Sequence, residues 1–131
     1  MKAWRVPFVV GSIGRLAYGV GAMAAPERMA GRLAPTLRNH PDPRMNLRGF
    51  GGAQSGIALY TLIEAASPAG AQRVLRLNAV VDAFDALVSA AEWRDRGELQ
   101  RVVAGGIAVN VASLLIWSAA AVALRRDAQA R

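Results

Sequence analysis

A run of 23 residues without a charged side chain, Val102–Leu124, most constrains how this chain folds. About 20 predominantly apolar residues in a helix cross the hydrocarbon core of a bilayer. Arg125 and Arg126 follow directly and end the run. A soluble four-helix bundle needs a polar face on every helix, and this segment has none. The run therefore predicts a transmembrane helix and favours a membrane protein over a soluble bundle.

Three further segments have the length and apolar content of membrane spans. The four predicted spans are residues 6–25, 47–66, 73–93 and 102–124. We therefore expect an all-α fold, a four-helix transmembrane bundle in a single domain that covers residues 1–131. The short turn at residues 67–70 predicts that the second and third spans are antiparallel neighbours. The first segment also resembles a cleaved signal peptide, but Arg15 interrupts its apolar part and favours a retained span.

The first connection, residues 26–38, predicts a short amphipathic helix between the first two spans. Its apolar residues recur every four positions between arginines, at Met29, Leu33 and Leu37. Such a helix lies at the membrane surface or packs on the bundle as a loop helix, and the sequence leaves both open. Residues 39–43 contain two prolines and predict a break, with His40 as a solvated turn residue.

The charge balance indicates the partners of the chain. The net charge is +7 and the pI is about 11.4. The arginines stand mostly between the apolar segments without interleaved aromatic residues, which favours a bilayer with anionic lipids and argues against nucleic acid. Four spans place both termini on one side. Basic residues are nearly balanced between the two sides, and the fewer acids beside the termini favour cytoplasmic termini in the inner (plasma) membrane.

A stripe of polar residues runs along the predicted helix 73–93. Its members are Asn78, Asp82, Asp85, Ser89 and Glu92, at spacings that share one helix face. An ionised side chain at bilayer depth costs about 2.5–3.5 kcal/mol on insertion scales, so buried charges pair. We therefore expect Arg15 to form an ion pair with Asp82 or Asp85. The other carboxylate is expected to hydrogen-bond Gln54, Asn110 or Tyr18, or to be protonated.

These residues form the candidate site, a buried polar cluster that binds a ligand, carries protons or only fixes helix register. Its members are Arg15, Gln54, Asn78, Asp82, Asp85 and Asn110. The second span also carries two small-xxx-small patterns, Gly52-xxx-Gly56 and Gly51-xxx-Ser55, which let helix backbones approach closely.

Catalytic and cofactor chemistry finds little support. The chain has no cysteine and one histidine, which excludes a thiolate site and a multi-histidine metal site within one chain. Asp82-Ala-Phe-Asp85 resembles the opening of the CDP-alcohol phosphotransferase motif, but the later aspartates of that motif are absent. We therefore expect no catalytic residue, no metal and no cofactor.

Several short motifs resemble a known family. They are Gly14-Arg15, Pro26-Glu27, Arg48-Gly-Phe-Gly-Gly-Ala and Val81-Asp82-Ala-Phe-Asp85-Ala. Together they resemble an uncharacterised family of small four-helix bacterial integral membrane proteins, frequent in actinobacteria. That family often has an arginine about where Gln54 stands here. The resemblance implies the topology and the buried charges, and it implies no activity.

Three functions follow as hypotheses. The first is a non-catalytic subunit or scaffold of a larger membrane complex or homo-oligomer. The second is a small proton- or solute-coupled transporter that uses the polar cluster. The third and least supported is a lipid-modifying membrane enzyme.

Overall fold

The structure is a computed structural model that describes residues 2–33, 41–96 and 101–130. Within these ranges it is all-helical. The helices are α1 (Arg5–Ala24), α2 (Pro26–Leu33), α3 (Pro41–Glu64), α4 (Pro68–Arg96) and α5 (Arg101–Gln129). The all-α class is thus confirmed, and the four long helices correspond to the four predicted apolar segments.

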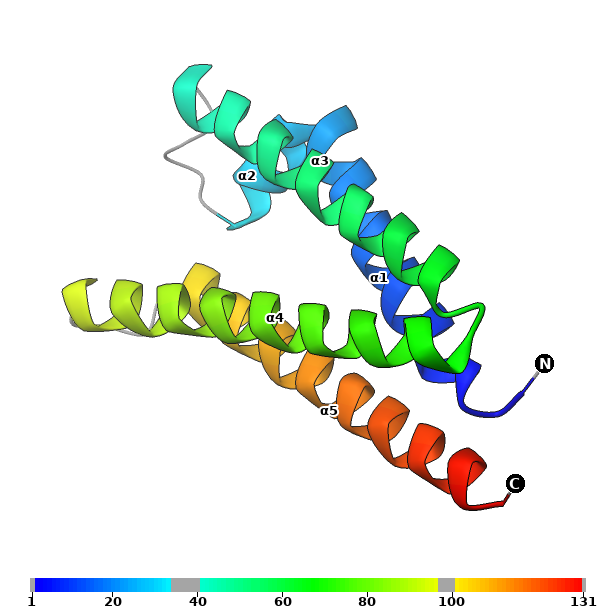
Figure 1. The fold of residues 1–131 in the computed structure, drawn as a ribbon. Coiled ribbons are helices and arrows are strands. Elements are labelled where there is room, and N and C mark those ends of the chain that lie inside the picture. Colours follow the sequence, from blue (N-terminus) through cyan, green and yellow to red (C-terminus); the bar gives the residue numbers. More distant parts are fainter. Residues whose placement is uncertain (1, 34–40, 97–100, 131) are drawn as a thin grey trace.

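The long helices form two antiparallel pairs (Figure 1). α1 packs along α3, and α4 packs along α5. The pairs meet at the end of the molecule that holds both chain termini, and they diverge toward the other end (Figure 1). α3 and α4 are antiparallel neighbours as predicted, but the divergence of the pairs limits their contact to the region near the turn.

A small apolar core holds the two pairs together where they meet. Trp4, just before α1, and Phe8 of α1 pack edge to face with ring centroids 6.1 Å apart, and the ring centroids of Phe8 and Trp117 of α5 are 6.0 Å apart. The buried members are Trp4, Phe8, Ala65, Ala71, Val74, Trp117, Ala120 and Leu124. These residues come from the start of α1, the turn between α3 and α4, the start of α4, and α5. We call this end of the molecule the closed end.

Glycines bring the backbones of α1 and α3 into direct contact. A Cβ atom placed on Gly51 would lie 2.6 Å from the carbonyl oxygen of Gly19, and one on Gly19 would lie 2.6 Å from that of Gly51. Real side chains do not fit at such distances, so glycine is required on both helices. Of the two small-residue patterns in α3, the one that contains Gly51 makes this close approach, whereas Gly56 has open space around it.

Prolines start helices here more often than they break them. α3 begins at Pro41, six residues before the predicted start of the second span, and Pro41 and Pro43 lie in its first turn. Likewise α4 begins at Pro68, where the Oγ of Ser67 caps it by accepting a bond from the N–H of Gly70 at 3.1 Å. Amide hydrogens in a first turn have no partner within the helix, so proline loses nothing there.

The charged ends of the predicted spans are also helical. α4 continues to Arg96, and α5 continues through Arg125 and Arg126 to Gln129, which corrects the expected span ends at residues 93 and 124. Arginine and alanine are good helix formers, and this tail has no glycine or proline. The predicted amphipathic helix is present as α2 up to Leu33, while residues 34–40, with His40, lie outside the described residues.

Two described helices are long and apolar enough to cross a membrane. They are α1 and residues 104–129 of α5. α3 and α4 are less apolar than these two helices or contain more charged residues, because polar and ionisable residues interrupt their sequences.

Candidate functional site: a buried ion pair

Arg15 of α1 and Asp82 of α4 form a hydrogen-bonded ion pair inside the molecule. The guanidinium Nη2 donates to Oδ1 of Asp82, and the side chains are 9% and 3% exposed. The ion pair expected from the sequence is therefore present, and Asp82 rather than Asp85 is the partner. Because α1 and α4 belong to different helix pairs, the ion pair joins one pair to the other.

The second oxygen of the same carboxylate accepts a hydrogen bond from α5. The indole Nε1 of Trp117 donates to Oδ2 of Asp82 at 2.6 Å. Gly11, one helical turn before Arg15, makes room for the indole, since a Cβ atom there would lie 2.7 Å from the ring. Both carboxylate oxygens are thus bound, and the network ties three helices together.

A second polar contact lies one helical turn away. Asn78, which is fully buried, donates through Nδ2 to the Oγ1 of Thr61 at 2.9 Å and to the carbonyl oxygen of Val74 at 2.7 Å. Thr61 belongs to α3, so this contact joins α3 and α4. Asn78 therefore lies one turn from Asp82 on α4, but it bonds to α3, whereas Asp82 bonds to α1 and α5.

Gln54 and Asn110 are buried as expected but do not join the network. Their side chains are 6% and 7% exposed. Among the described residues, neither hydrogen-bonds to Arg15 or to an aspartate. The predicted bond between them and the second carboxylate is therefore absent from this part of the chain. Each stands seven residues before a residue that does bond, Thr61 in α3 and Trp117 in α5.

Asp85, the second carboxylate, is partly buried and near the pair. It interacts electrostatically with Arg15, Asp82 and Tyr18, but its carboxylate accepts no hydrogen bond from any described residue. Farther along the stripe, Ser89 is partly buried and Glu92 is exposed. The stripe is therefore enclosed at the closed end and opens where the helix pairs diverge.

Three buried polar atoms near the pair have no hydrogen-bond partner among the described residues. They are Nη1 of Arg15, Oγ of Ser12 and Oδ1 of Asn78. Two of them, on Arg15 and Ser12, are one turn apart on α1. Together with the Asp85 carboxylate they give this region both unused donors and unused acceptors.

The described residues contain no group of three histidine, cysteine or acidic side chains placed to hold a metal ion. The site that they build consists of one cation, two carboxylates, an indole and neutral amides and hydroxyls. Such a set can fix helices in place, and it can bind or pass a proton.

Comparisons of the chain with protein-family models, with curated proteins and with solved structures find no match. The resemblance to the family of small bacterial membrane proteins stays a prediction.

Proposed function

We propose that this chain is a small integral membrane protein with four transmembrane helices, α1, α3, α4 and α5. We further propose that it acts without catalysis, as a subunit or scaffold of a membrane complex or homo-oligomer. It lies in the plasma membrane with both termini in the cytoplasm, and α2 lies near the surface of the bilayer.

The inverted exposure of α4 carries the membrane proposal. Its polar residues Asn78 and Asp82 are buried, at 0% and 2% exposure. Its large apolar residues point outward, and Phe84, Leu87 and Val88 are 63–65% exposed. In water this arrangement leaves an extended apolar surface uncovered. In a bilayer the same surface contacts lipid, and the buried polar residues bond to one another.

The lengths of α3 and α4 agree with this reading. With 24 and 29 residues they extend over about 36 and 44 Å at 1.5 Å per residue. Both exceed the hydrocarbon thickness of about 30 Å. Residues that face the interior of the molecule, such as Gln54, Thr61 and Asp82, contribute to their modest hydropathy.

The network around Asp82 supports a structural role for the polar cluster. The carboxylate receives an ionic hydrogen bond from α1 and a neutral one from α5, so it is satisfied without a ligand. Exposed small residues on α3, Gly49, Ala53 and Gly56, leave a smooth face for another helix. A protein held together internally and smooth on one face is suited to association.

The test begins with the membrane fraction. We expect the wild-type protein to stay with membranes after alkaline carbonate extraction. After solubilisation in mild detergent, native mass spectrometry should then detect a stoichiometric oligomer or hetero-complex. Release into the carbonate supernatant contradicts the membrane location. A homogeneous detergent monomer that captures no membrane protein after crosslinking in the native membrane contradicts the scaffold role.

A second candidate function is favoured by Asp85. This carboxylate lies beside the pair without a hydrogen-bond donor among the described residues, and Nη1 of Arg15 is likewise unused. A proton-coupled transporter needs such a carboxylate inside the membrane. Proton flux into liposomes that Asp85→Asn abolishes supports this function, and the exposed Asp95→Asn serves as the control. Wild-type flux equal to that of empty liposomes rules it out.

A further inference from the structure

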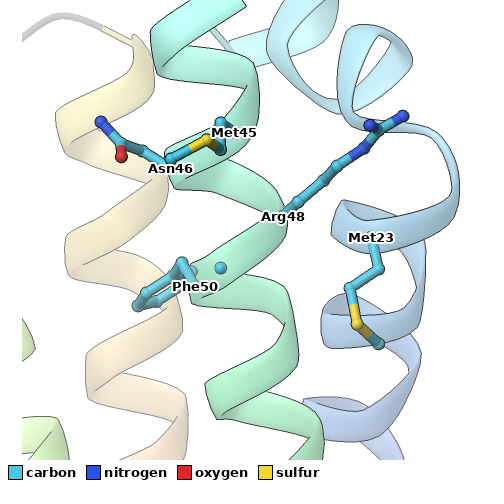
Figure 2. Close-up of a pocket in the computed structure, with 6 residues that line it drawn as sticks. Met23, Met45, Asn46, Arg48 and Phe50 are labelled. Atoms are coloured by element: carbon cyan, nitrogen blue, oxygen red, sulfur yellow. The ribbon is translucent and has the colours of Figure 1, made fainter.

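A shallow depression of about 640 Å³ lies on the surface where the end of α1 meets the first turns of α3. Its lining residues are Met23, Met45, Asn46, Arg48, Gly49 and Phe50 (Figure 2). The volume falls within the range of about 300–1,000 Å³ that is typical of small-molecule sites. Neither Arg15 nor Asp82, the members of the ion pair, lines it.

The lining is mostly apolar and adaptable. Met23 of α1 and Met45 of α3 have flexible thioether side chains, and Phe50 adds an aromatic face. All three are exposed. Gly49 contributes no side chain, and a Cβ atom there would meet nothing within 4 Å, so the space beside Gly49 is open. Flexible thioethers adapt their shape to irregular apolar partners, and a hydrocarbon chain is such a partner.

One positive charge stands at the edge of this apolar lining. In Figure 2 the side chain of Arg48 extends away from α3 on the side of α1, above Met23. Arg48 is exposed and forms no ion pair with any described residue. Arg44, one turn earlier, is instead neutralised by Glu27 at 2.6 Å. The charge of Arg48 is therefore available to an anion.

We propose that this depression binds an anionic phospholipid, with its phosphate at Arg48 and an acyl chain against Met23, Met45 and Phe50. The inference rests on the membrane location given under the proposed function. Arg48 stands near the end of the apolar part of α3, close to where α1 ends at Ala24. In a bilayer this position corresponds to the depth of the lipid headgroups.

A second depression offers a comparison within the same molecule. It lies at the closed end, between the start of α1 and the end of α5, and Trp4, Val122, Arg126 and Asp127 are among its lining residues. Here an acidic residue stands next to the arginine in the sequence and in the lining. The first depression is lined by an arginine and no acid, so only the first has the charge that favours an anion.

The experiment uses the full chain in phosphatidylcholine vesicles that contain a trace of photoreactive lipid. The probe is phosphatidylglycerol or phosphatidylcholine with a diazirine in one acyl chain, and peptide mass spectrometry locates the adducts. Flotation of the protein with the vesicles is measured first. Without flotation the proposed membrane location fails, and the lipid site fails with it.

With flotation intact, we expect phosphatidylglycerol to label residues 45–50 about fivefold more than phosphatidylcholine does. This factor corresponds to about 1 kcal/mol for one arginine near an anionic lipid. Arg48→Gln should remove the difference, Arg48→Lys should keep most of it, and Arg126→Gln should leave it unchanged. Equal labelling by the two lipids, or an unchanged ratio in a floating Arg48→Gln protein, overturns the lipid site while the membrane location stands.

Discussion

Trp117 and Asp82, 35 residues apart in the sequence, are joined by a hydrogen bond of 2.6 Å from the indole Nε1 to Oδ2. Through it α5 takes part in an ion pair whose charges both come from other helices, Arg15 from α1 and Asp82 from α4. The indole ring also packs against Phe8 in the apolar core. One side chain thus serves the core and the polar network together.

Trp117→Phe separates these two contributions. Phenylalanine keeps an aromatic ring against Phe8 but cannot donate to Asp82. Hydrogen bonds to charged groups contribute about 1.5–3 kcal/mol, so we expect the free energy of unfolding to fall by about that amount. Unfolding in mixed detergent micelles, followed by circular dichroism, measures it. Trp93→Phe is the control, because Trp93 is 47% exposed, and an equal loss in both variants would contradict the role of the hydrogen bond.

Removing one member of the ion pair should destabilise the protein strongly. Arg15→Ala or Asp82→Asn leaves a buried partner uncompensated, which costs about 3–5 kcal/mol. The double variant should lose less than the sum of the two single losses, as a double-mutant cycle of unfolding measures. Arg44→Ala breaks the exposed pair with Glu27 and should cost less than about 1 kcal/mol. Additive losses at Arg15 and Asp82 would show that the two residues are not coupled.

The two glycine patterns of α3 should respond in opposite directions to alanine. Gly51→Ala places a methyl group against the carbonyl oxygen of Gly19 and should destabilise the protein by about 1–3 kcal/mol. Gly56→Ala meets open space, and alanine favours helix over glycine by up to about 1 kcal/mol. Thermal aggregation of the two variants in detergent ranks them against wild type. A more stable Gly51→Ala protein would mean that α1 and α3 are farther apart.

The chain has no cysteine, so single introduced cysteines report its topology without a background. Ala3→Cys and Ala130→Cys should behave alike and resist a membrane-impermeant maleimide in intact cells. Asp95→Cys, at the other end of α4, should react. All three positions are exposed in the structure. A reactive Ala3→Cys beside a protected Asp95→Cys would reverse the proposed orientation and leave the four spans intact.

Much of the fold and part of the site follow from the sequence. The cost of burying charge is enough to bring Arg15 and an aspartate together, since each is the best available partner for the other. The choice of Asp82 over Asp85 depends on the angle at which the two helix pairs diverge. The spacing of polar and apolar residues in the sequence does not determine that angle. A donor role for Trp117 depends on which helices are neighbours.

Gln54 and Asn110 show the other limit of reasoning from the sequence. Both are amides on apolar helices, and both are buried as a membrane helix predicts. Whether a buried amide reaches a given carboxylate depends on how its helix is rotated about its axis and on where the amide lies along that axis, to within about one turn. Thr61 and Trp117, seven residues farther along the same helices, stand at the depths of Asn78 and Asp82 instead.

The spacing of the ion pair along the chain has a consequence for biosynthesis. Arg15 and Asp82 are separated by 67 residues. At a synthesis rate of about 5–20 residues per second, α1 emerges about 3–13 s before the aspartate that neutralises it. In a chain inserted as it is made, the first helix waits for that time with an uncompensated guanidinium. Under the proposed membrane location, the guanidinium of Arg15 is neutralised by Asp82 only when α4, the third long helix, arrives.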